Sequence, residues 1–92
     1  MELQITNYNN FFKLKGILNR NSINKFHAEF SNIFEKVNAL TISIENIELM
    51  DKYGVDALAS LHNESVVKNK SLSIIGFGCK ELYDHFKTQA AA

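Results

Sequence analysis

The residues that could take part in catalysis are few and widely spaced along the chain. Gly76, Gly78 and Cys79 follow an expected strand and precede an expected helix, where a dinucleotide-binding turn would lie. The third glycine of that pattern is absent, and the acid Glu81 lies where a bound pyrophosphate would be repelled. We therefore interpret this stretch as a glycine-rich turn and Cys79 as a small packed thiol.

The histidines and acidic residues also lack the spacing that a reactive site requires. His27, His62 and His85 fall on three different expected helices, and none has a second ligand one turn away on the apolar side. We place His27 and His62 at the boundary of the core. Asp51 and Asp56 are five residues apart and do not share one helix face, which disfavours paired acid–base chemistry. We predict no metal, no cofactor and no enzymatic activity.

Composition narrows the class of partner. Ten basic and ten acidic residues among 92 give a formal net charge of +0, whereas binding to phosphates requires a basic excess or stripe. We therefore expect no nucleic-acid partner. One cysteine permits no internal disulfide, no apolar run approaches the roughly 18 residues of a membrane helix, and the first four residues, 1–4, contain no basic residue. These features predict a cytoplasmic protein without membrane insertion, and they leave its oligomeric state open.

Alternation of apolar and polar residues predicts four strands, near 3–6, 11–15, 39–45 and 71–75. The asparagine-rich stretch 7–10 fits a hairpin turn between the first two. Each strand has one polar face, which is typical of a sheet covered on one side only and excludes a doubly wound sheet. The residues of that polar face, which we expect to be solvated, are Lys13, Lys15, Thr41, Ser43 and Glu45.

Helical periodicity occupies the segments between the strands. An apolar stripe from Ile23 to Val37 predicts one helix, with Asn21 or Ser22 as its N-cap and Asn38 at its end. A second helix is expected from about Tyr53 to Lys68 and is capped by Asp51. Its inward-facing residues are expected to be Val55, Leu58, Leu61, His62, Ser65 and Val66.

A short third helix is expected from about Cys79 to Lys87. The predicted fold class is therefore α/β, a small mixed β-sheet with helices on one face in the order β-β-α-β-α-β-α. Residues 1–88 are expected to form a single domain. Residues 89–92 are expected to be a disordered tail, whose closing Ala90–Ala92 are either native or derived from cloning.

One segment of the sequence contains a more specific motif than the rest of the chain. The expected strand 39–45 leads through 46–50 into Asp51-Lys52-Tyr53-Gly54-Val55-Asp56-Ala57-Leu58. This resembles the STAS domain, the sulfate transporter and anti-sigma factor antagonist family, in which Asp-Ser-Ser/Thr-Gly opens a helix after a strand and a short loop. Gly16-Ile17-Leu18-Asn19, followed by Ser22, is similar to the family's Gly-x-Leu-Asp turn, and 72–76 resembles its last core strand. The resemblance implies a STAS-like fold.

This sequence departs from the family at the residue that a partner kinase phosphorylates. Lys52 replaces that serine and Tyr53 replaces the second Ser/Thr, so no phosphorylation is expected at the usual position. Elsewhere, Asn19 replaces an acid of the turn, and Ser43 replaces an acid common on the third strand.

The resemblance implies a partner-binding site at the start of the second helix. In our hypothesis, the charged side chain of Lys52 contacts an acidic patch of the partner, and the Tyr53 ring serves as an aromatic anchor beside it. Asp51 caps the helix, Gly54 lets a partner approach closely, and Asp56 completes the site. The alternative is that this loop has lost its ancestral role and is merely solvated.

The resemblance implies a regulatory protein that binds an anti-sigma factor of the serine-kinase type and thereby frees a sigma factor, without control by phosphorylation. An alternative is a STAS-like accessory subunit seated on the ATPase of a lipid-transport ABC system. A third and less favoured reading is a small nucleotide-binding domain or enzyme that uses the glycines of 76–78 and Cys79.

Overall fold

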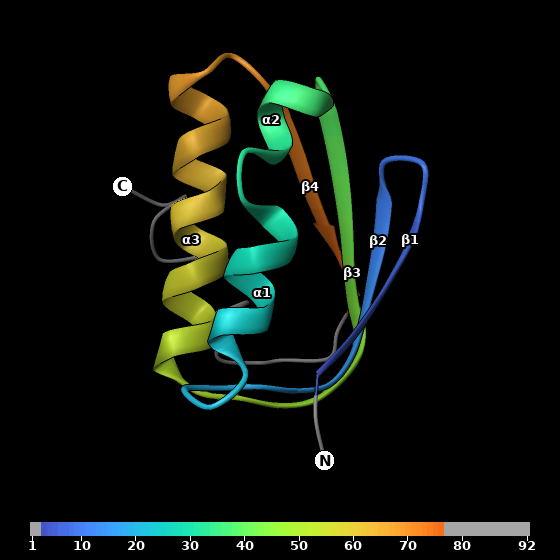
Figure 1. Cartoon of the computed structure of the whole chain (residues 1–92), viewed down its shortest axis with the longest axis vertical. Helices are drawn as coiled ribbons and strands as arrows, with labels where there is room; N and C mark the ends of the chain where they lie inside the picture. Colours follow the sequence, from blue (N-terminus) through green and yellow to red (C-terminus); the bar gives the residue numbers. More distant parts are fainter. Residues whose placement is uncertain (1–2, 77–92) are drawn as a thin grey trace.

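The computed structural model describes residues 3–76. Its elements are β1 (Gln4–Tyr8), β2 (Phe11–Leu18), α1 (Ile23–Phe30), α2 (Ile33–Lys36), β3 (Ala39–Met50), α3 (Lys52–Val67) and β4 (Ser71–Ile75). The strands form one sheet in the order β1-β2-β3-β4, in which β1 is antiparallel to β2 and the other neighbours are parallel. The helices cover one face of this sheet (Figure 1). The predicted fold class is thus confirmed, while the expected helix 79–87 and tail 89–92 lie outside the described residues.

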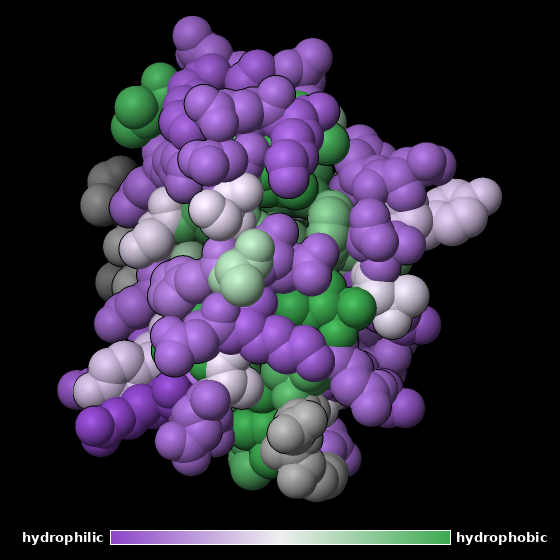
Figure 2. Space-filling model, viewed as in Figure 1, coloured by the Kyte–Doolittle hydropathy of each residue, from purple (hydrophilic) through white to green (hydrophobic). Residues whose placement is uncertain are grey.

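The core lies between the helices and the sheet. Alternate residues of β2, beginning with Phe12 and Leu14, are buried, as the period of two requires. Phe30 of α1 packs between Phe12 of the sheet and Phe26 of its own helix, with ring centroids 4.9 Å and 4.6 Å apart. In the space-filling view, hydrophobic residues show in the seam between the helical layer and the sheet, and most of the remaining surface is hydrophilic (Figure 2). No helix within residues 3–76 has the length and apolar content to cross a membrane.

The apolar stripe from Ile23 to Val37 forms two helices rather than the single helix we expected. The break falls at Ser31 and Asn32, and Asn32 adopts a left-handed backbone with φ of 57°. Asparagine tolerates this conformation better than most residues, so the chain can turn there. The turn lets Ile33 and Phe34 both reach the core, which explains why the apolar periodicity continues through the break.

β3 extends to Met50, so residues 46–50 belong to a strand and not to the short loop we expected. Two register shifts against β2 each add one residue to β3. Such bulges change which residues face the core. The buried positions accordingly move from a spacing of two at Ile42 and Ile44 to a spacing of three at Ile47 and Met50. The second half of the strand is not predicted by alternation, because its buried residues no longer recur at every second position.

Three further expectations about exposure are wrong. His27 is exposed rather than at the core boundary. Val66 is 62% exposed, because the buried stripe of α3 ends at Ser65 and the next residue is rotated away from it. Ser43 belongs to the polar face of the sheet but is only 3% exposed, since it lies between its strand neighbours Lys13 and Ile75.

Candidate functional site

The candidate site forms where two parallel strands end side by side. Leu18, the last residue of β2, pairs with Met50, the last residue of β3. The connections that follow them, residues 19–22 and Asp51, therefore leave the sheet at the same edge. The backbone N–H of Asp51 donates to the carbonyl oxygen of Leu18 at 3.3 Å, which extends the pairing by one residue to the start of α3.

Asp51 is the N-cap of α3, as the sequence predicted. Its Oδ1 accepts hydrogen bonds from the backbone N–H groups of Tyr53 at 3.0 Å and Gly54 at 3.1 Å, two of the donors that a helix leaves unpaired at its start. Its Oδ2 accepts from the backbone N–H of Arg20 at 3.0 Å. Partial burial acts to raise the pKa of Asp51, but hydrogen bonds from Arg20, Gly54 and Tyr53 outweigh it and hold that pKa below its usual value.

Asn19 organises the turn of residues 19–22, which follows β2 and lies beside the cap of α3. Its Oδ1 accepts from the backbone N–H groups of Asn21 at 3.0 Å and Ser22 at 3.1 Å. The Ser22 hydroxyl donates to the carbonyl oxygen of Ile17 at 2.7 Å, and it makes no capping bond to α1. The amide of Asn19 thus supplies the acceptor that the turn needs without a negative charge. Gly16 to Leu18 belong to β2, so the turn begins later than the motif resemblance indicated.

Gly54 is buried, and its missing side chain serves packing within the protein. A Cβ atom there would lie 2.7 Å from the carbonyl oxygen of Leu18 and 2.6 Å from Cγ of Met50. The glycine therefore lets the first turn of α3 rest directly on the ends of β2 and β3. Our expectation that Gly54 leaves space for a partner is not supported at this position, since that space is occupied by the sheet.

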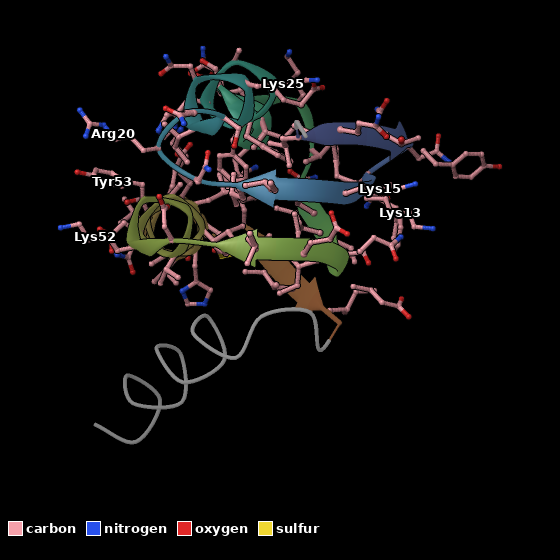
Figure 3. All side chains as sticks on the ribbon, turned by 90° about the horizontal axis from the view of Figure 1, so that it is seen from below. Lys13, Lys15, Arg20, Lys25, Lys52 and Tyr53 are labelled. Carbon is pink, nitrogen blue, oxygen red and sulfur yellow. The ribbon has the colours of Figure 1, made fainter. Side chains whose placement is uncertain are left out.

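Lys52, Tyr53 and Asp56 are all exposed on the first turns of α3. The Nζ of Lys52 lies 5.5 Å from the centroid of the Tyr53 ring, and the Tyr53 side chain is 43% exposed. Arg20, which no sequence pattern indicated as a site residue, projects at the same end of the molecule as Lys52 and Tyr53 (Figure 3). The pairing of Leu18 with Met50 and the backbone bond from Arg20 to Asp51 bring it there, and no local sequence pattern predicts these contacts.

Residues 3–76 contain no group of three or more His, Cys, Asp or Glu arranged to hold a metal. Gly76 has a φ of +108°, and a Cβ there would lie 2.7 Å from the backbone nitrogen of Glu45. This glycine is thus explained by a close backbone approach. Gly78, Cys79, Glu81 and His85 lie outside the described residues.

The comparisons with known proteins identify the fold. In sequence, the chain matches no protein-family model and no curated protein. In structure, it is similar to the unphosphorylated form of the anti-sigma factor antagonist SpoIIAA, with a TM-score of 0.71 and 16% sequence identity. The match covers 92% of this chain and 81% of the SpoIIAA chain. At this identity the likeness establishes the architecture, and it confirms the expected STAS fold.

Proposed function

We propose that this chain is a cytoplasmic regulatory protein that acts by binding and not by catalysis, and that its partner is an anti-sigma factor of the serine-kinase type. Binding would sequester that factor and free a sigma factor. The contact surface is the start of α3, where Lys52 and Tyr53 meet the partner and Asp56 lies one turn further on. Because Lys52 has no hydroxyl, the kinase activity of the partner does not switch the complex off at this position.

The observation that carries this proposal is the geometry around Asp51. The capping bonds fix the first turn of α3 rigidly against the ends of β2 and β3, while the side chains that follow the cap stay exposed. A preordered surface costs less conformational entropy on binding than a mobile loop does. The structural likeness to an anti-sigma factor antagonist supports the choice of partner class.

The test is a calorimetric titration of the purified chain with the serine-kinase-type anti-sigma factors of its native cell. We expect one of them to bind, and the double variant K52A/Y53A to bind at least about tenfold more weakly, as for an aromatic and charged contact pair. The matched control is K13A/K15A, because these lysines project from the opposite end of the sheet in Figure 3 and should leave the affinity unchanged.

The same titration is repeated with the ATPase of a lipid-exporting ABC system. Binding to this ATPase in preference to every anti-sigma factor would contradict the proposal in favour of the accessory-subunit alternative. Equal affinities of the anti-sigma factor for K52A/Y53A and for the unaltered chain would contradict the proposed contact surface.

A further inference from the structure

Three exposed side chains from two different segments form one surface, which we call the α3-start surface: Arg20, Lys52 and Tyr53. Arg20 lies in the turn after β2, and the other two residues open α3. The carboxylate of Asp51 holds the two segments together through the backbone N–H groups of Arg20 and Tyr53. All three side chains project outward at one end of the molecule, whereas Lys13 and Lys15 project from the other end (Figure 3).

Neither Arg20 nor Lys52 forms an ion pair within the part of the chain that the structure describes, residues 3–76. Among residues 3–76 the one ion pair is between Lys68 and Glu64, at the far end of α3. Asp56 lies one turn after Lys52 on the same helix face, yet it forms no ion pair with it in this part of the chain. Both carboxylate oxygens of Asp51 accept hydrogen bonds from backbone N–H groups, and Asp51 forms no ion pair within residues 3–76. Within residues 3–76, the side chains of Arg20 and Lys52 are therefore not engaged in ion pairs, and both remain available to a partner.

The α3-start surface also offers an apolar component. Tyr53 is 43% exposed, and the Lys52 ammonium over its ring orders both side chains through a cation–π contact. Aromatic residues and arginine are enriched at protein–protein contacts, and charges around such a contact help to select the partner.

We propose that the α3-start surface recognises an acidic protein surface, with Asp or Glu side chains placed to meet Arg20 and Lys52 around an apolar residue that packs on Tyr53. This inference rests on the proposed function and names the chemistry of the partner's contact patch. Two cations are too few for a nucleic-acid backbone, since proteins that bind DNA through phosphates make about six to ten such contacts. The number of positive charges is therefore more consistent with a protein partner than with a nucleic acid.

The test uses the isotope-labelled full chain and a short acidic peptide, Asp-Glu-Leu-Glu-Asp, followed by NMR amide shifts. We expect shifts at residues 19–22 and 51–54, and none at residues 13–15. The peptide Asn-Gln-Leu-Gln-Asn, which keeps the shape but removes the charge, should produce no shifts. Addition of salt should weaken the acidic peptide's binding, because exposed charge pairs are screened.

The double variant R20E/K52E should bind the acidic peptide at least about tenfold more weakly, and the matched control K13E/K15E should bind it as the unaltered chain does. In the unaltered chain, the side chains of Arg20 and Lys52 make no hydrogen bond or ion pair within the described residues. The double variant should therefore fold normally, which circular dichroism would verify. Equal shifts with both peptides, shifts located elsewhere, or a DNA duplex that shifts the α3-start surface more strongly would overturn the proposal.

Because the peptide assay needs no anti-sigma factor, it separates this inference from the proposed function. An anti-sigma factor that binds while the acidic peptide does not would overturn the acidic-patch inference alone. A chain that binds the acidic peptide at the α3-start surface but no anti-sigma factor would overturn the choice of partner alone.

Discussion

The backbone N–H of Arg20 donates to Oδ2 of Asp51 at 3.0 Å, across 31 positions of sequence. The same carboxylate caps α3 through its other oxygen. One side chain therefore fixes the turn after β2 and the start of α3 relative to each other. This bond thus ties Arg20 to the residues that open α3, in addition to the pairing of Leu18 with Met50.

Replacement of Asp51 by Ala should lower the free energy of unfolding by about 1–2 kcal/mol, because the first turn of α3 loses its cap and the turn at Arg20 loses its anchor. Urea denaturation measures this change. Asp56, exposed on the same helix, is the matched control, and D56A should change the free energy by no more than about 0.5 kcal/mol. Equal effects of the two substitutions would contradict the assigned role of Asp51.

The stability that Asp51 contributes should depend on pH. Its pKa in the folded protein is lowered by hydrogen bonds, whereas an unfolded Asp has a pKa of about 3.9. The contribution is therefore complete above about pH 4 and is lost as the pH falls through the lower, folded pKa. Denaturation of the unaltered chain and D51N at a series of pH values should give curves that converge in acid. Parallel curves would show that the ionised carboxylate is unimportant.

Replacement of Gly54 by Ala should destabilise the protein by about 1–3 kcal/mol, although Ala is the better helix former. The new methyl group would collide with the carbonyl oxygen of Leu18, which is backbone and cannot easily move. S60A, an exposed substitution further along α3, provides the control and should be neutral or slightly stabilising. A gain in stability with G54A would contradict the close packing of α3 on the strand ends.

Replacement of Lys52 by Glu should have opposite effects on stability and on binding. A positive charge at a helix N-terminus is unfavourable, so K52E should raise the free energy of unfolding by about 0.3–1 kcal/mol. Its affinity for the anti-sigma factor should nevertheless fall, because the charge presented to the partner is reversed. Thermal unfolding and calorimetric titration measure the two effects, with K13E as the control. A parallel loss of stability and affinity would indicate damage to the fold instead.

The sequence predicted those features that depend on residues close together in the chain. The strand alternation from Phe12 to Leu14 and the N-cap at Asp51 are local patterns, and both are confirmed. The order of strands and helices follows from such patterns together with the short connections. The apolar stripe from Ile23 to Val37 also predicted the buried phenylalanines and Ile33, although it included the exposed His27 and did not reveal the break at Asn32.

The features that were missed depend on contacts between distant segments. The bulges of β3 are defined only against β2, and the reason for Gly54 is visible only when Leu18 and Met50 are placed beside it. Arg20 joins the site through a hydrogen bond to Asp51, and nothing in its neighbouring residues marks it as part of a surface. Burial of Ser43 likewise follows from its neighbours on β2 and β4.

The central claim is that the chain binds its anti-sigma factor regardless of that factor's kinase activity. Its most direct test is the dissociation constant of the complex before and after incubation with ATP, with phosphate incorporation measured by mass spectrometry. We expect no phosphate on the unaltered chain and an unchanged dissociation constant, whereas K52S, which places a hydroxyl at this position, should gain phosphate and be released from the complex. Stoichiometric phosphate on the unaltered chain, accompanied by its release, would contradict the claim.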